Sequence, residues 1–269
     1  MINYAAAILV WDTNAMDTVV RGIVHKINNT GAPGSAPNRE EEFLATFEAV
    51  FDGVTNHLNC VNHTSDRVFI DEVNPELPGC QLRNGKPLVE EYCGKHGFTG
   101  RWSTSIEQRI PCEDATDGEI DDVRHLMLED HGRKDASLIV AAVKLSNAAN
   151  AQTVIITDDT GLAEDIINLP KRHEVVQMGG TEYSTSRITT SLSIQFLREL
   201  HLSCGIDNET WQHIMLSFKQ HHNGRHAAAA RSHERHVIEF FQNFHSDCEE
   251  KARRATTREL AQALGENNG

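Results

Sequence analysis

Acidic side chains follow two of the apolar segments of this chain, at the point where each segment ends. Asp12 follows the run Ala6–Trp11, and Asp158 and Asp159 stand at the end of the run that starts at Val154. Short apolar runs of this kind are typical of buried parallel strands. Carboxylates that share a pocket repel each other unless cations neutralise them, and Mg²⁺ and Mn²⁺ prefer oxygen ligands. The pattern therefore indicates divalent-cation chemistry, in which a bound ion activates water and stabilises charge on a phosphate.

Four segments hold the candidate acids in a fixed order: VWDTNAM (10–16), VFIDEVNPEL (68–77), KDASLIVAA (134–142) and VIITDDTGL (154–162). Taken together, they resemble the PIN-domain nuclease family. In that family the first strand ends in an Asp, a Glu-Leu pair lies early in a following helix, an Asp opens a later helix, and a strand ends in Thr-x-Asp. The resemblance spans residues 6 to about 177 and leaves the C-terminal part unexplained.

The resemblance implies a metal-dependent endonuclease, with Mg²⁺ or Mn²⁺ as cofactor and with RNA favoured over DNA as substrate. Its catalytic and metal-binding acids fall on Asp12, Glu76, Asp135 and Asp159, with Asp158 as a further metal ligand. Asn14 takes a position at which the family often has a polar residue near the metal. No nucleophilic side chain is needed, because a metal-activated water attacks the phosphate.

Three features of the chain depart from the common small members of the family. The interval between Glu76 and Asp135 is long, because residues 78–117 form an insertion. Pro75 directly precedes Glu76, which leaves Asp71 and Glu72 as alternatives for the second acid. The length of the chain also argues against a minimal toxin of a toxin–antitoxin pair.

Each acid also has an ordinary structural interpretation. The sequence Asp12-Thr-Asn is good turn chemistry, and Asp135 suits the N-cap of a helix. Glu76 suits the first turn of a helix, where the helix dipole favours an acid. One of Asp158 and Asp159 is expected to cap the turn that follows them.

The elements that must position these acids follow from apolar periodicity. Alternation of strands and helices predicts a three-layer α/β/α fold with a central parallel sheet, PIN-like, over residues 1–184. In such sheets, sites lie beyond the carboxyl ends of the strands. The expected strands are Ala6–Trp11, Val68–Ile70, Val154–Thr157 and Glu174–Gln177. The expected helices in this part begin near Asn38, with Glu41 as a capping-box partner, at Glu119 (to Glu129) and at Asp135.

The insertion at residues 78–117 is rich in Gly, Pro, charge and cysteine and has weak periodicity. Cys93 and His96 have the spacing of half a zinc site, but no second close pair accompanies them. Buried single thiols are the more ordinary interpretation. The six cysteines of the chain form no Cys-x-x-Cys pair, and we expect reduced thiols.

Residues 185–269 are predicted to form an α-helical extension. Its expected helices are Ser193–Leu202, Glu209–Gln220, Ala227–His245 and Glu249–Leu264. The stretch Leu216–His236 is basic and rich in histidine, and it is a candidate nucleic-acid or partner surface. Its candidate nucleic-acid contacts are Lys219, Arg225, Arg231 and Arg235. A solvated helix face with titrating histidines is the ordinary alternative, and His222 with His226 is a weaker metal candidate.

The net charge of −14 lies entirely in residues 1–184, and residues 185–269 are balanced. An acidic surface repels a phosphate backbone, so nucleic-acid binding requires bound cations, the C-terminal part or a partner protein. No apolar run has the length of a membrane helix, so we expect no membrane partner. No secretory signal is evident, and a cytoplasmic location is expected. The helical extension is expected to bind RNA, a protein partner or a second copy of the chain.

Two other classes of function are weighed against the nuclease. A PIN-like scaffold that binds nucleic acid or protein without cutting would not need the full set of acids. A phosphatase- or nucleotide-handling α/β fold is less favoured, because the chain lacks a Walker-type loop and a GxGxxG motif after its first strand. Asn14 also stands where an aspartyl-phosphate enzyme would carry its second Asp.

Overall fold

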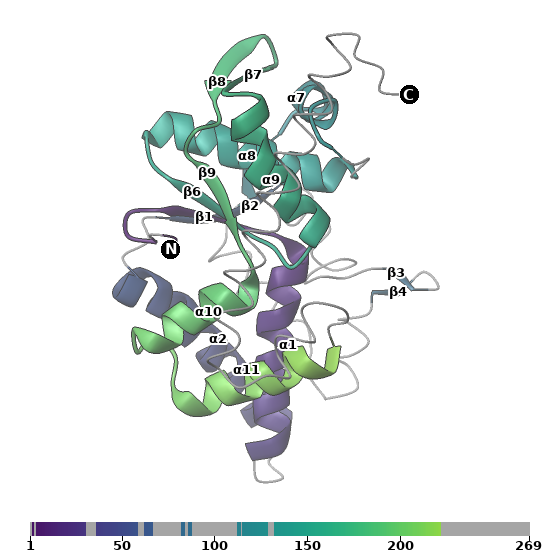
Figure 1. Ribbon diagram of the computed structural model, residues 1–269. Helices are drawn as coiled ribbons and strands as arrows, with labels where there is room; N and C mark the ends of the chain where they lie inside the picture. The colour runs from purple at the N-terminus through teal and green to yellow at the C-terminus, as the bar shows by residue number, and fades with distance from the viewer. Residues whose placement is uncertain are drawn as a thin grey trace, which may run out of the picture.

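The central strand β1, Ile8–Trp11, is apolar and buried along its whole length, as expected of a strand covered on both faces. It pairs in parallel with β2 (Asn62–Asp66) on one side and with β6 (Thr153–Ile156) on the other. The edge strands are β5 (Cys112–Glu113) beside β2 and β9 (Ile188–Ser191) beside β6, both parallel. The protein is therefore mixed α/β, with a parallel sheet in the order β5-β2-β1-β6-β9 (Figure 1).

This architecture comes from a computed structural model, which describes residues 2, 4–30, 36–58, 62–66, 82–83, 86–87, 112–113, 115–128 and 132–221. Within these residues, no helix is both long and apolar enough to span a membrane.

The alternation of side chains along β1 and β6 divides the core into two apolar clusters. Trp11 and Ile156 point into the first cluster, and Val10 and Ile155 point into the second. The first cluster is closed by four helices: α1 (Thr13–Thr30), α2 (Ala36–Leu58), α10 (Ser193–Leu202) and α11 (Asn208–His221). The second is closed mainly by α7 (Asp117–Arg124), α8 (Arg133–Ala149) and α9 (Thr160–Arg172). Figure 1 shows the two groups of helices on opposite sides of the strands.

One expected strand belongs to a different sheet. The segment expected at Glu174–Gln177 forms β7 (Val175–Met178), but β7 pairs antiparallel with β8 (Thr181–Ser184) in a separate hairpin. Its residues alternate exposed and buried, which is the pattern of a strand covered on one face only. The place beside β6 is taken by β9, whose sequence ITTS has no apolar run to reveal it.

The helices agree with the sequence to different degrees. Helix α10 has the expected bounds, and α11 extends the expected Glu209–Gln220 by one residue at each end. Helix α2 begins at Ala36, two residues before the expected start, and α7 spans Asp117–Arg124 rather than residues 119–129. No element was expected from the sequence at α1.

Much of the expected insertion, and the expected strand Val68–Ile70, lies outside the described residues. The described parts of residues 78–117 include β5 and a short hairpin of β3 (Leu82–Arg83) and β4 (Lys86–Pro87). Because β5 joins the main sheet, the end of residues 78–117 contributes an edge strand to that sheet.

The expected division of the chain at residue 184 falls between β8 and β9. Strand β9 lies in the main sheet, and α10 and α11 share one apolar cluster with α1 and α2. The described residues after 184 are thus continuous with the core of the residues before it. The remaining expected helices, Ala227–His245 and Glu249–Leu264, lie outside the described residues.

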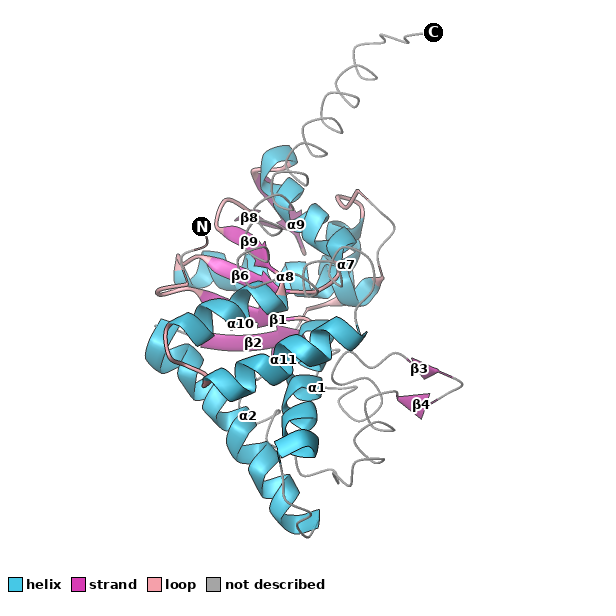
Figure 2. Ribbon diagram, turned by 60° about the horizontal axis from the view of Figure 1, so that its bottom comes forward, coloured by secondary structure: helices cyan, strands magenta, loops and turns pink. Residues whose placement is uncertain are grey.

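Helices α1 and α11 cross at a glycine (Figure 2). A Cβ atom added to Gly22 would lie 2.5 Å from Cγ1 and 2.8 Å from Cα of Ile214. Real Cβ atoms do not approach other heavy atoms this closely, and the Cα of Ile214 cannot move away by a rotation of its side chain. Only glycine therefore permits this approach of the two helices.

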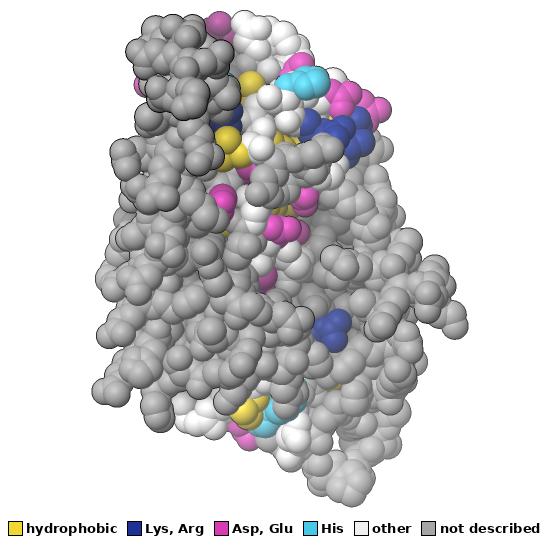
Figure 3. All heavy atoms as spheres, turned by 45° about the vertical axis from the view of Figure 1, so that its right-hand side comes forward, with side chains coloured by type: hydrophobic (Ala, Val, Ile, Leu, Met, Phe, Trp, Pro, Cys, Tyr) yellow, Lys and Arg dark blue, Asp and Glu magenta, His cyan; other side chains and the backbone are white. Residues whose placement is uncertain are grey.

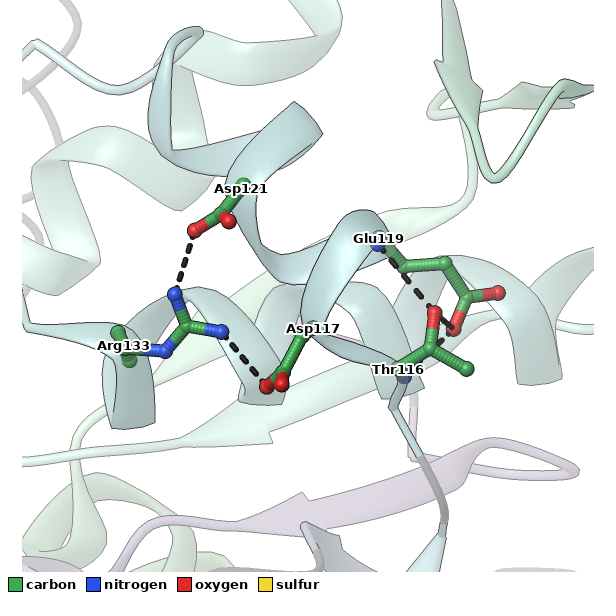
Figure 4. A network of polar contacts seen from close by, with 5 residues as sticks. All are labelled: Thr116, Asp117, Glu119, Asp121 and Arg133. Atoms are coloured by element: carbon green, nitrogen blue, oxygen red, sulfur yellow. Dashed lines mark hydrogen bonds and ion pairs between the residues drawn. The ribbon is translucent and has the colours of Figure 1, made fainter.

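The start of α7 is fixed by a capping box, in which Thr116 and Glu119 bond each other's backbone (Figure 4). Lys144 Nζ of α8 lies 3.2 Å from a Glu119 oxygen. Burial raises the pKa of Glu119, but the hydrogen bonds from Thr116 and Lys144 and the charge of Lys144 lower it by more, so this pKa lies below its ordinary value. Arg133 joins the two helices a second time, by donating to Asp117 and Asp121.

We predict that Gly22→Ala destabilises the protein by about 1–3 kcal/mol, because the clash with Ile214 outweighs the gain of up to about 1 kcal/mol in helix propensity. Gly118→Ala in α7 is the matched control, since nothing lies within 4 Å of its added Cβ. Chemical denaturation should show a lower midpoint for the first variant and an equal or higher one for the control. Equal midpoints for Gly22→Ala and the wild type would show that the helices do not meet as described.

We predict that Glu119→Gln lowers stability by about 0.3–1 kcal/mol at pH 7, because glutamine can keep the capping box but loses the charge that pairs with Lys144. Because the folded-state pKa of Glu119 is depressed, its stabilisation is present above the unfolded pKa of about 4.3 and is lost as pH falls through the folded pKa. The two proteins should therefore converge in stability as the pH falls towards 3. Denaturation midpoints measured between pH 7 and 3 test this, with exposed Glu174→Gln as a control; a constant difference would contradict it.

Candidate functional site

Three neighbouring strands end at one level of the sheet. Trp11 of β1 lies opposite Ile156 of β6, which lies opposite Ser191 of β9. One further hydrogen bond extends each strand pair. The N–H of Asp12 donates to Ile156 O at 2.9 Å, and the N–H of Thr157 donates to Ser191 O at 3.0 Å. The residues that follow β1, β6 and β9 are therefore brought together at the carboxyl edge.

The strand order reverses at this place. The connection after β1 passes through α1 and α2 to β2 on one side, and the connection after β6 leads through α9 to β9 on the other side. Open parallel sheets bind ligands beyond the carboxyl ends of the strands at such a switch point. The acids predicted from the sequence after β1 and β6 flank this switch point.

Asp12 is 7% exposed, although it is an acid. One of its oxygens, Oδ2, accepts a hydrogen bond from Thr157 Oγ1 at 2.5 Å. Its carbonyl oxygen accepts hydrogen bonds from the N–H groups of Ala15 and Met16, in the first turn of α1. The backbone of Asp12 thus begins a helix, while its carboxylate reaches across the edge to the end of β6.

Thr157 joins the ends of the two strands. Its hydroxyl donates to Asp12 and accepts the N–H of Asp159 at 3.0 Å. Asn14 makes a second bridge, because its Oδ1 accepts the N–H of Asp158 at 2.8 Å. Thr157 was not among the site residues expected from the sequence; its place as the Thr of Thr-x-Asp is the signal that could have identified it.

Asp158 is 8% exposed, and both of its oxygens accept hydrogen bonds. Thr18 Oγ1 and Ser193 Oγ each donate to Oδ2 at 2.6 Å, and the N–H of Ser193 donates to Oδ1 at 2.9 Å. These donors come from α1 and from the first residue of α10. No sequence pattern indicated Thr18 or Ser193, because their role depends on the packing of distant helices around the strand ends.

Asp159 is the N-cap of α9. Its Oδ1 accepts the N–H groups of Gly161 at 2.8 Å and Leu162 at 3.1 Å. The expectation that one of the two consecutive acids caps the following turn is confirmed, and the capping acid is Asp159. These bonds use one of its two carboxylate oxygens.

Asp135 lies on another element, the helix that leads into β6. It is half-buried in the first turn of α8, whose N-cap is Gly132. The interpretation of Asp135 as the N-cap is therefore wrong, because the helix begins two residues before it. Since the C-terminal end of α8 leads directly into β6, its first turn points towards the carboxyl edge of the sheet.

The structure leaves several expected residues undescribed. Glu76, its alternatives Asp71 and Glu72, and the Cys93/His96 pair lie outside the described residues, as do Arg225, Arg231, Arg235, His222 and His226. Lys219 lies in α11, but its side chain is not described. Within the described ranges, no three His, Cys, Asp or Glu side chains lie close enough to hold a metal ion together.

The charged side chains on the face drawn in Figure 3 are mixed rather than segregated. Among the described residues of this face, Lys and Arg form small separate groups, and acids lie beside or between them. The described residues of this face form no continuous basic band for a phosphate backbone, in agreement with the acidic charge of residues 1–184.

We predict that Ser193→Ala destabilises the protein by about 1.5–3 kcal/mol, because the buried Asp158 carboxylate loses a charge-assisted hydrogen bond. Thr18→Val, which keeps the shape of the side chain, should have a similar effect. Ser186→Ala is the control: Ser186 is exposed and its hydroxyl bonds the hydroxyl of Ser184 at the surface, so the change should stay within about 0.5 kcal/mol. If urea denaturation shows all three variants equal to the wild type, the carboxylate of Asp158 is not held as described.

Comparisons of the chain with protein-family models, with curated proteins and with solved structures found no match in any of the three.

Proposed function

We propose that this protein is a divalent-metal-dependent endonuclease of the PIN-like type, which hydrolyses phosphodiester bonds in RNA. The proposal includes the finer fold, a three-layer α/β/α arrangement of that family. The observation that carries it is the meeting of Asp12, Asn14, Asp158 and Asp159 at the switch point of a parallel sheet. RNA is the substrate class that the sequence resemblance implies.

The burial of acids at this edge supports a site rather than an ordinary surface. A buried carboxylate costs free energy unless hydrogen bonds or cations compensate its charge. Asp12 and Asp158 are both at least nine-tenths buried and lie on adjacent strand ends. If these acids served only to form turns, an exposed position would cost less free energy.

The donor set fits Mg²⁺ or Mn²⁺ by its chemistry. Carboxylate and amide oxygens are hard ligands, and Mg²⁺ commonly takes only one or two carboxylates and keeps several waters. The proposal assigns the metal to Asp12, Asp135 and Asp159, with Glu76 as the fourth acid. In the described residues these three side chains do not lie close enough to share one ion, so binding requires them to move together. When bound, the ion supplies charge for the phosphate and lowers the pKa of a water.

The chain's own residues then have distinct roles. Asp12 is oriented by Thr157, and Asn14 holds the backbone of the next strand end. Asp158, whose two oxygens already accept three hydrogen bonds, is better suited to positioning the edge than to binding metal. The set of metal ligands expected from the sequence is thereby narrowed in this proposal to the acids other than Asp158.

Nucleic-acid binding has to overcome the acidic charge of residues 1–184. A metal-loaded site reverses the local charge, and the basic stretch after residue 216 offers further contacts. Lys219, Arg225, Arg231 and Arg235 remain the candidate contacts to RNA. Helix α11, which shares an apolar core with α1, includes the start of this stretch in the sequence. The same extension remains a candidate surface for a protein partner or a second copy.

A non-cleaving PIN-like scaffold is the alternative, and one observation favours it. Hydrogen bonds to the chain use both oxygens of Asp158 and one oxygen each of Asp12 and Asp159. A cluster that exists to tie strands and helices together would look the same. Metal binding and cleavage distinguish the two functions.

We predict that the wild type cuts labelled single-stranded RNA with Mn²⁺ or Mg²⁺ and not with EDTA. Asp12→Asn should lower the rate at least about a hundredfold, because removal of a ligand exceeds the 10–100-fold effect typical of groups that only orient ligands. Asp117→Asn is the control, since this acid on α7 is 94% exposed and pairs with Arg133 of α8. Equal unfolding midpoints of the variants show that a lost activity is not lost folding.

The outcomes separate the two functions. Metal-dependent cutting that is lost in Asp12→Asn and kept in Asp117→Asn supports the nuclease. Absence of cutting in RNA and DNA, together with no Mn²⁺ binding in calorimetry, contradicts it and leaves the scaffold. Labelled DNA in the same assay tests the preference for RNA.

A further inference from the structure

Two histidines face each other across the contact of α1 and α11. Nδ1 of His25 lies 2.9 Å from Nδ1 of His213, and the ring centroids are 5.1 Å apart. Both side chains are half-buried. His25 is one turn beyond Gly22, and His213 directly precedes Ile214, so the pair borders the closest approach of the two helices. The backbone at this crossing holds the two nitrogens in place.

Two imidazole nitrogens at this distance need a positive centre between them, because their lone pairs otherwise repel. In the absence of metal, one Nδ1–H donates to the other Nδ1. A transition-metal ion can replace this shared proton, since neutral imidazole is the most common metal ligand in proteins. Burial lowers the pKa of His25, and the neighbouring His213 lowers it further, which favours the neutral form.

The separation of the two nitrogens, an ordinary hydrogen-bond length, is also short enough for both to bind one ion once the rings turn their lone pairs towards it. With metal–nitrogen bonds of about 2.05 Å, a right angle at the metal gives about 2.9 Å between the ligand atoms, and a tetrahedral angle gives about 3.3 Å. The observed 2.9 Å matches the right angle. Right angles between ligands occur in the tetragonal sites of Cu²⁺ and Ni²⁺, whereas structural Zn²⁺ is tetrahedral.

Charges of both signs lie near the pair, with Arg21 one turn before His25 on α1 and Lys26 directly after it. Lys26, the nearest basic neighbour in sequence, donates to Thr210 Oγ1 and lies 3.6 Å from the carboxylate of Asp207. Glu209, one turn before His213, also lies 4.0 Å from Lys26 Nζ. Two acids at the start of α11 thus offset the lysine beside His25.

We propose that His25 and His213 form a binding site for Cu²⁺ or Ni²⁺ that links α1 to α11. Two protein ligands leave the other positions to water, because the described residues place no third His, Cys, Asp or Glu at the pair. The site is separate from the proposed nuclease: along α1, His25 lies about 20 Å beyond Asp12. The ion joins the first helix after β1 to the last described helix of the chain.

Thermal unfolding of the full chain with NiCl₂ tests the proposal. A ligand that binds only the folded state raises the Tm, whereas histidines that bind equally in both states do not. At Ni²⁺ about 100 times its Kd, the wild type should gain about 5–10 °C over its value in EDTA. His25→Gln and His213→Gln should each lose this gain, and the double variant should lose no more than either single one.

His125→Gln, at the exposed C-cap of α7, is the matched control and should keep the full gain. Electron paramagnetic resonance of the wild type with one equivalent of Cu²⁺ should show two coordinating nitrogens, with at least about tenfold weaker binding after loss of either histidine. The wild-type spectrum decides the question even if a variant folds poorly. An equal Tm gain in both single variants, or no gain and no two-nitrogen signal in the wild type, would overturn the proposal.

Discussion

The carboxylate of Asp158 is the interaction on which the carboxyl edge of the sheet depends. A buried charge is tolerated only when donors surround it, and here they come from α1 and α10, which lie far apart in the sequence. Asp158 lies two residues after the end of β6, so the same three hydrogen bonds fix the end of that strand against both helices. Its backbone N–H is bound by Asn14, and the preceding residue, Thr157, orients Asp12. The hydrogen bonds that fix Asp158 therefore also restrict the position of Asp12, through Thr157 and Asn14.

The two consecutive acids show how adjacent identical side chains acquire different chemistry. The carboxylate of Asp158 points towards α1 and α10 and accepts hydrogen bonds from two hydroxyls and one backbone N–H. Asp159 points to the start of α9 and satisfies two of its free N–H groups with one oxygen. Burial and helix geometry, rather than residue type, thus make one acid a buried bridge between two helices and the other an N-cap.

The sequence predicted the parts of this structure that local pattern determines. Strands β1 and β6 are apolar runs buried on both faces, and α10 has clear helical periodicity, so each was identified with nearly correct bounds. Strand β9 is rich in threonine and lies at the edge of the sheet, where an apolar run is not required. The sequence revealed Asp12 and Asp158 by their position after strands, but Thr18 and Ser193 act through tertiary packing, which no local pattern encodes.

The position of Ser193 also decides how the C-terminal region relates to the site. As the first residue of α10, it supplies two of the three hydrogen bonds to Asp158, so this region is part of the edge rather than an attachment to it. Loss of α10 would remove both hydrogen bonds from Ser193 and leave, of these three, only the one from the Thr18 hydroxyl. A buried charge with too few hydrogen-bond donors costs several kcal/mol. Helix α11 is held in turn by the close contact at Gly22, and it precedes the basic stretch of the chain. A ligand or partner that displaced these helices would therefore act on the acids through Ser193, without touching them.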